Sequence, residues 1–341
     1  MSSSANLNIE ASSKVRKSGI FPFFILLLIL AAIDISLAFI AVPLRLAFIG
    51  SLAVSVITVG LPIYALYRAS RANWTPRLGA FFLVGGILVQ IAFTVIAIRL
   101  QHTPNRGGMY ALILVTLSQM ALLTWCLGVG GLLASVIKDR NMILPIAIVL
   151  AALDTFLVLS PFGFTHKLLK THPEVIRRIG YHVNLVPTRI THAPLSPMIF
   201  IGPADFLFLG MFFITLSKFG MKTEKTFRTV APVLLIYLLI VAVFGGMRIG
   251  PIPLGALPAL LPIGLVIVIV NYKEWQMTVE EKIITFVIFL LACGLVVFGF
   301  SRVAAKQATR SKDSGQSQVS QSPIPPGQVP NQHLQKGSLN L

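Results

Sequence analysis

Residues 197–219 read PMIFIGPADFLFLGMFFITLSKF, an apolar run in which Asp205 is the only charge before Lys218. A helix needs roughly 20 apolar residues to cross the hydrocarbon core of a bilayer, and this run is long enough. An ionisable group at mid-membrane costs roughly 2.5 to 3.5 kcal/mol, so acids there tend to face a cavity or a partner and to serve a function. The run therefore predicts a transmembrane helix whose aspartate has a chemical role.

Similar apolar runs recur along the chain. Only 11% of the 341 residues are charged and 55% are hydrophobic, whereas about a quarter of a soluble domain is charged. We therefore predict an all-α, polytopic transmembrane helix bundle with about nine spans, an integral, multi-pass membrane protein. The predicted spans cover residues 20–42, 46–67, 78–99, 109–137, 142–163, 197–219, 229–248, 252–270 and 284–302.

Composition divides the chain into five segments. They are a polar N-terminal segment (1–19), N-terminal transmembrane helices (20–137), core helices with a basic loop at 164–196 (138–270), a C-terminal transmembrane helix (271–303) and a Ser-, Gln- and Pro-rich tail (304–341). The tail has too few large apolar side chains to offset its ordering entropy, so we expect it to be disordered, as we do the polar N-terminal segment.

The net charge of +17 does not predict nucleic-acid binding, because the cations are scattered over nearly every loop and form no single basic face. Lipid headgroups of the bilayer explain them more simply, although counting Lys and Arg does not settle the orientation. His166, His172, His182 and His192 lie in the 164–196 loop without the spacing of a helical zinc site, so no metal is predicted. No cofactor is implied either. The two cysteines predict no disulfide framework.

Three acids lie well inside predicted spans: Asp34, Asp154 and Asp205. Asp154 and Asp205 lie roughly 12 to 14 Å below the membrane face that carries the 164–196 loop, on consecutive antiparallel helices. Two carboxyl groups that face each other at one depth share a proton, which is the chemistry of aspartic proteases and also of proton-coupled transporters. Asp34 has no acidic counterpart at its depth, and we expect it to be turned into the bundle and hydrogen-bonded there.

Three stretches resemble the presenilin and signal peptide peptidase family of GxGD intramembrane aspartyl proteases. LDTFLVLSPFG (153–163) is similar to the first catalytic helix, and IGPADFLF (201–208) is similar to the GxGD segment. GALPALLPIGL (255–265) contains the family's PAL signature and lies two spans after the second aspartate. The resemblance covers roughly residues 142–270. It implies a presenilin-like fold, with Asp154 and Asp205 as the catalytic pair and with Gly202, Pro258, Ala259 and Leu260 shaping the substrate site.

The sequence departs from the family's motifs at two positions. Leu153 stands where the family has a tyrosine, and Ala204 stands where it has the glycine before the second aspartate. Pro203 occupies the variable position, where we expect it to cost a helical hydrogen bond. In the third stretch, the prolines near the start of the predicted eighth span remove helical hydrogen bonds, and the resemblance implies that an unwound substrate docks on this open backbone as an added strand.

Three functions follow from these residues. The first is an intramembrane aspartyl protease, an aspartic endopeptidase that hydrolyses peptide bonds of transmembrane protein or peptide substrates by two-aspartate acid and base catalysis. The second is a proton-coupled transporter that uses the same carboxylates. The third is a presenilin-like protein that binds transmembrane segments without cutting them. No HExxH motif occurs, and no histidine lies inside a predicted span, so zinc and serine protease mechanisms fit poorly. Accessory subunits do not follow from the sequence.

Overall fold

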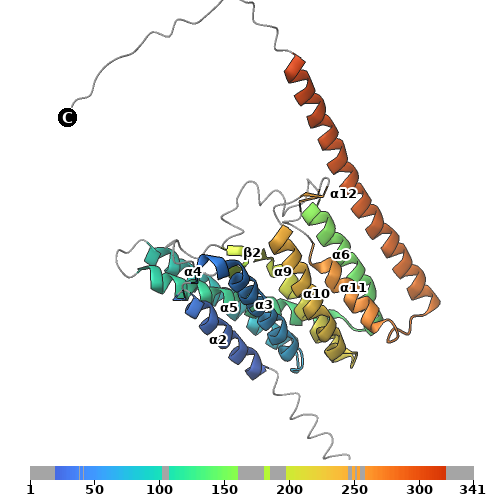
Figure 1. The fold of residues 1–341 in the computed structure, drawn as a ribbon. Helices are drawn as coiled ribbons and strands as arrows, with labels where there is room; N and C mark the ends of the chain where they lie inside the picture. The colour runs from blue at the N-terminus through green and yellow to red at the C-terminus, as the bar shows by residue number, and fades with distance from the viewer. Residues whose placement is uncertain are drawn as a thin grey trace, which may run out of the picture.

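The computed structural model of the chain describes residues 20–37, 39–40, 42–101, 107–159, 180–184, 197–244, 248–249, 252–253 and 258–319. Helices dominate, with two short β-hairpins between them (Figure 1). The elements are α2 (Ile20–Leu37), α3 (Leu44–Ala69), α4 (Pro76–Gln101), α5 (Gly107–Val136), the 3-10 turn η1 (Arg140–Met142), α6 (Ile143–Leu159), β1 (Tyr181–Asn184), β2 (Pro197–Ile201), α9 (Pro203–Lys218), α10 (Thr223–Phe244), β3 (Arg248–Ile249), β4 (Ile252–Pro253), α11 (Leu260–Asn271) and α12 (Val279–Val319).

Six of the described helices are long and apolar enough to cross a membrane. Their apolar stretches are Ile20–Leu37, Phe48–Ala69, Pro76–Leu100, Met109–Val136, Arg140–Val158 and Val279–Phe298. The α-helical class expected from composition is thus confirmed, and the six apolar helices agree with a multi-pass membrane protein. The other three predicted spans coincide with α9, α10 and α11, of which α9 has 16 residues and α11 has 12. These two helices are shorter than the roughly 20 residues that a complete crossing takes.

The span predicted at 197–219 is not helical throughout, which corrects its boundary. Residues 197–201 form strand β2, which pairs antiparallel with β1, and the helix begins only at Pro203. The cause is the Gly-Pro pair: a residue that precedes proline is pushed out of the α region, and Gly202 has φ −66° and ψ 144°. The hairpin packs inside the protein, because Tyr181 and Val183 of β1 are fully buried.

The span predicted at 252–270 is interrupted in the same way. Residues 252–253 form strand β4, paired with β3, and α11 begins only at Leu260. Both α9 and α11 are therefore shortened helices, each preceded by a hairpin and followed by a longer helix. Figure 1 shows that both begin at the same end of the bundle, the end that carries the hairpins.

At the other end of the chain, α12 continues to Val319, past the residue 302 at which we predicted the last span to end. The tail boundary predicted at 304 therefore falls inside a helix, and the disorder predicted for residues 320–341 lies outside the described residues. With 41 residues, α12 is about 62 Å long, twice the thickness of a hydrocarbon core. In the apolar stretch Val279–Phe298 every residue except Thr285 is exposed or half-buried.

Helix α9 lies at the centre of the bundle, with α2 to α5 on one side and α6, α11 and α12 on the other (Figure 1). Its residues from Leu209 to Leu216 are all buried. A helix that is apolar around its whole circumference belongs in an interior, and here that interior is protein. The central position of α9 fixes Asp205, in its first turn, inside the bundle.

The packing of α5 on α9 depends on a glycine. A Cβ atom added at Gly130 of α5 would lie 2.8 Å from both the carbonyl oxygen of Leu207 and the nitrogen of Met211. We expect Gly130→Ala to lower the free energy of unfolding by about 1 to 3 kcal/mol, because backbone atoms of α9 cannot move aside without shifting the helix. Thermal unfolding in detergent measures this.

The matched control is Gly85→Ala in α4, where an added Cβ meets nothing within 4 Å. Alanine is the better helix former, so this variant should be as stable as the wild type or gain up to about 1 kcal/mol. Equal losses in the two variants would contradict a close α5–α9 contact.

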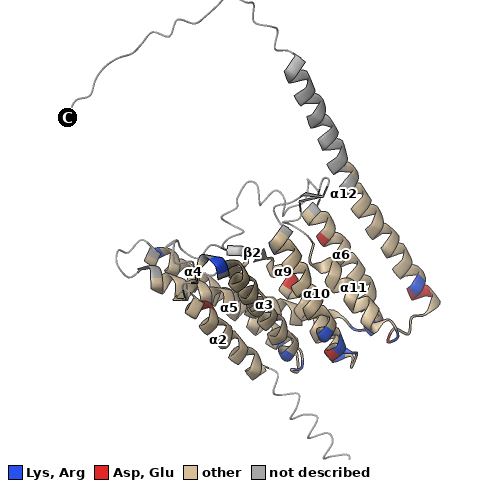
Figure 2. Ribbon diagram, viewed as in Figure 1, with Lys and Arg blue, Asp and Glu red and all other residues tan. Residues whose placement is uncertain are grey.

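Charges on the described chain gather at the helix ends (Figure 2). At the end opposite the hairpins, Lys222 pairs with Glu274 at 2.8 Å, and Arg228 pairs with Glu224 at 2.6 Å. Helices α6 and α9 carry one acidic residue each within their length, Asp154 and Asp205.

Candidate active site

Asp154 lies in the last turns of α6, where it meets the beginning of α11. Its Oδ2 atom accepts a hydrogen bond of 2.9 Å from the backbone N–H of Leu260, the first residue of α11. The N–H groups of a first helical turn have no partner within the helix, and the helix dipole favours a negative charge there. The predicted first aspartate and the predicted Pro-Ala-Leu segment are thus in direct contact.

Asp205 lies in the first turn of α9 and folds back on its own helix start. Gly202 is the N-cap, so Pro203, Ala204 and Asp205 occupy the first three helical positions. The Asp205 carboxyl group lies close to Gly202, where an added Cβ would be 3.5 Å from Oδ2. An acid at the third helical position is where a capping box places the group that turns back toward the N-cap.

The two carboxyl groups belong to one site. Asp154 and Asp205 interact electrostatically although 51 positions separate them in the sequence (205 minus 154). Each also faces a helix N-terminus, α11 for Asp154 and α9 for Asp205. Three separate segments, one each on α6, α9 and the start of α11, therefore converge at one place in the bundle.

The remaining predicted substrate-site residues lie at the start of α11. Pro258 is buried, and Ala259 is the N-cap, with φ −78° and ψ −24°. The side chain of Leu260 is buried as well, so its backbone amide, not its side chain, is what it offers to the carboxylate. Gly202 has an ordinary φ of −66°, and an added Cβ there would meet Asp205 Oδ2 only at 3.5 Å. A residue with a side chain would therefore fit at position 202 without a clash inside the chain.

The predicted cost of Pro203 is wrong. At the first position of a helix the backbone N–H has no acceptor within the helix, so proline loses no hydrogen bond there, and its fixed φ suits the helix start. The carbonyl oxygen of Pro203 accepts a contact of 3.3 Å from Cys126 Sγ of α5, which ties this turn to the neighbouring helix. The Gly-Pro-Ala-Asp sequence is thus a well-formed helix start.

The methyl group of Ala204 does not fill the candidate site, because Ala204 is exposed. We expect Ala204→Gly to change the function of the site by less than about threefold, and to lower stability slightly because glycine is the poorer helix former. Steady-state assays of the wild type and the variant measure this. A gain of tenfold or more would contradict the exposed position of the methyl group.

One polar side chain near the two acids carried no sequence motif. The hydroxyl group of Tyr237 in α10 is buried, has no hydrogen-bond partner among the described residues, and interacts electrostatically with both Asp154 and Asp205. The only sequence signal is a single hydroxyl in the apolar run VLLIYLLIVAVF (233–244). The sequence alone does not show which groups this hydroxyl approaches, because that depends on how the helices pack.

Asp34 belongs to a different cluster, as its lack of an acidic counterpart indicated. It is buried in α2 and interacts electrostatically with Tyr181 of β1, whose hydroxyl group donates to the carbonyl oxygen of Thr58 at 2.9 Å.

His182 lies beside Gln119, with 3.3 Å between Nδ1 and Nε2, while the other three histidines of the 164–196 loop fall outside the described residues. No group of three potential metal ligands forms among the residues that the structure describes.

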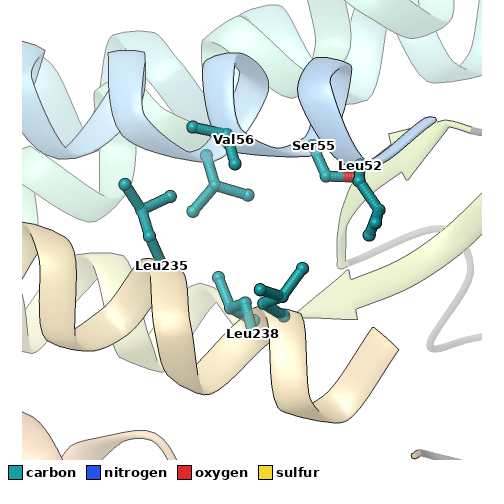
Figure 3. A pocket seen from close by; sticks show the side chains of 7 residues that line it. Leu52, Ser55, Val56, Leu235 and Leu238 are labelled. Atoms are coloured by element: carbon teal, nitrogen blue, oxygen red, sulfur yellow. The ribbon is translucent and has the colours of Figure 1, made fainter. Parts of the chain in front are cut away.

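Two hollows lie away from the aspartates. A gap between α3 and α10 is lined by six apolar side chains and by Ser55, whose hydroxyl donates to the carbonyl oxygen of Ser51 (Figure 3). A second cavity, of about 320 Å³, lies where the α3–α4 turn meets the ends of α5 and α9, and it includes Lys218. Lys218 already donates to the carbonyl oxygens of Ala134 and Ile137, at 3.0 and 2.6 Å. Neither hollow contains a carboxyl group.

Comparison of the chain with protein families, with curated proteins and with solved structures finds no match. The chemistry of the site therefore has to be argued from its own residues.

Proposed function

We propose that the chain is an intramembrane aspartyl protease, with Asp154 and Asp205 as its acid and base pair and with a presenilin-like arrangement of about nine membrane segments. One observation carries this proposal: two carboxyl groups from different helices interact inside an apolar bundle, and one of them is bound to the backbone amide of Leu260. Two like charges in such surroundings cannot both be ionised cheaply, so the pair retains one shared proton.

Hydrolysis by this pair needs one carboxylate, one carboxylic acid and a water molecule. The carboxylate takes a proton from the water as the water oxygen forms a bond to the carbonyl carbon of the substrate. The carbonyl π electrons move to the carbonyl oxygen, which takes the proton of the other carboxyl group. In the second step the C–N bond breaks, the nitrogen receives a proton from the first carboxyl group, and one hydroxyl returns its proton to the second. The pair ends as it began.

The substrate is a transmembrane protein or peptide, because the site lies between apolar helices. The interrupted backbone before α9 and α11 supports this choice. Strand β2 ends at Ile201, four residues before Asp205, and α11 begins only at Leu260, whose amide binds Asp154, so each aspartate lies next to the start of a helix. Such backbone at membrane depth is tolerated where it is buried in protein or lines a wet cavity. Gly202 and the segment Pro258–Leu260 would contact the substrate there.

The test is direct. Purified protein in liposomes is incubated with a panel of single-span peptides, with and without a transition-state analogue directed at aspartyl proteases. The proposal expects at least one peptide to be cut and the analogue to stop the cutting. Intact peptides across a broad panel that still bind the protein would favour a non-cleaving binder of transmembrane segments.

A proton-coupled transporter is the second candidate, and the two short helices that begin beside the carboxyl groups, α9 and α11, favour it. Transporters commonly place discontinuous helices at mid-membrane, with their N-termini pointing at a substrate. Here α9 and α11 begin at the same end of the bundle, so they form no inverted pair (Figure 1). Uptake of solutes into protein-containing liposomes under an imposed proton gradient tests this candidate, and gradient-driven uptake without peptide cleavage would replace the protease proposal.

A further inference from the structure

Helix α10 carries one hydroxyl group in the middle of an apolar run, that of Tyr237. The oxygen atom is buried and has no hydrogen-bond partner among the described residues. Leaving a buried hydroxyl unpaired costs about 1 to 3 kcal/mol, a cost that phenylalanine would avoid at the same position. The hydroxyl therefore calls for a partner that the described chain does not supply.

The turn between α9 and α10 places Tyr237 at the level of Asp205. The two helices run antiparallel through the tight turn that contains Gly220, whose φ of 65° suits glycine. Helix α9 ends at Lys218, and α10 begins at Thr223. From the helical rise per residue, Asp205 lies about 20 Å from Lys218, and Tyr237 lies about 21 Å from Thr223. The two side chains are therefore nearly equidistant from the turn.

A second contact sets Tyr237 level with Leu260. Asn271 at the end of α11 is fully buried and donates a hydrogen bond of 2.9 Å to the hydroxyl of Thr226 in α10. Leu260 precedes Asn271 by about three helical turns, and Tyr237 follows Thr226 by the same interval on the antiparallel helix. Because this interval is close to a whole number of turns, Tyr237 also lies on the face of α10 that Thr226 turns toward α11.

The leucine side chains on the opposite face of α10 agree with this orientation of Tyr237. Leu235, Leu238 and Leu239 line the gap toward α3, and Figure 3 shows Leu235 and Leu238 turned toward that gap. Tyr237 is turned away from them and interacts electrostatically with both Asp154 and Asp205. No hydrogen bond joins its hydroxyl to either acid.

We propose that Tyr237 is a catalytic residue, whose hydroxyl donates a hydrogen bond to the carbonyl oxygen of the peptide bond held between Asp154 and Asp205. This role rests on the proposed protease function. The bond strengthens as negative charge develops on that oxygen during addition of water, and the phenol keeps its proton throughout. A donor fixed in place before the reaction stabilises the transition state more than the bound substrate.

The test is Tyr237→Phe, which removes one oxygen atom and keeps the ring. We expect kcat to fall about 10- to 100-fold, at or below the loss that follows removal of an oxyanion donor in other hydrolases, with KM within about threefold. Affinity for a hydroxyl-bearing transition-state analogue should fall by a similar factor, while affinity for an uncut peptide stays unchanged. The matched control is Tyr272→Phe, since Tyr272 is exposed at the end of α11.

The outcomes separate the two proposals. If the wild type cuts peptides and Tyr237→Phe cuts them equally well, the role of Tyr237 is overturned and the protease stands. A merely structural tyrosine would instead lower the thermal unfolding temperature and raise KM with kcat unchanged, which also overturns the role. If the wild type cuts no peptide and binds no analogue, both proposals fall together.

Discussion

Replacing either Asp154 or Asp205 by Asn should reduce cleavage by about 10³-fold or more, to the background of the assay. General acid and base catalysis contributes about 10²- to 10⁴-fold for each group, and an amide can neither take nor give the proton. Because the two acids act as one unit, the double variant should be no worse than either single one. Cleavage of labelled single-span peptides in liposomes measures all three.

Asparagine is chosen because it preserves the structural roles of both acids. Its side-chain oxygen can still accept from the amide of Leu260 at position 154, and at position 205 it keeps the size and polarity of the acid beside Gly202. Thermal unfolding and binding of uncut peptide should therefore stay close to the wild type. Asp34→Asn is the matched control, a buried acid of the same bundle in a different cluster, and it should keep cleavage within about threefold. Persistent cleavage in Asp154→Asn or Asp205→Asn would refute the acid pair.

The helical class of this chain follows from composition, because nothing but helices and closed barrels can satisfy a backbone in lipid. The starts of α9 and α11 did not follow from it. Hydropathy is the same for an apolar strand and an apolar helix, so residues 197–201 were assigned to a span although they pair with β1. The Gly202–Pro203 step was the available signal, since proline restricts the residue before it and is welcome at a helix start.

The candidate site also contains some residues that the sequence predicts and others that it does not. Asp154 and Asp205 could be selected because a charge in an apolar run is conspicuous, and matched depth on consecutive helices indicated a pair. Leu260 could be named through the resemblance of the Pro-Ala-Leu segment, but its amide as the partner of Asp154 could not be predicted, since every residue has an amide. The hydroxyl of Tyr237 could not be predicted either, because a single tyrosine in a membrane helix is common. Their roles depend on antiparallel register, which is set by the α9–α10 turn and by the Asn271–Thr226 hydrogen bond. Register appears only when the helices are packed.

The rate of cleavage should follow a bell-shaped curve against pH. Below the optimum both carboxyl groups carry a proton and no base remains, and above it both are ionised and no acid remains. Each limb should fall about tenfold per pH unit, so kcat two units beyond either limit should be about 100-fold below the maximum. A transporter would respond to the pH difference across the membrane, whereas a protease responds to the pH at its site.

Unfolding in acid must be separated from the acid limb, and the Lys222–Glu274 pair makes this possible. The hydrogen bond from Lys222, followed by the positive charges of Lys222 and Arg140, lowers the pKa of Glu274 below its ordinary value of 4.5. The folded state therefore holds this carboxylate more strongly than the unfolded state does. The resulting stability is present above pH 4.5 and is lost as pH falls through the folded-state pKa.

Glu274→Gln should remove this part of the pH dependence of thermal unfolding and leave the acid limb of kcat where it is. If the acid limb of kcat moves in Glu274→Gln, that limb reports unfolding at the far end of the bundle. The pH profile would then give no evidence for a proton shared by Asp154 and Asp205.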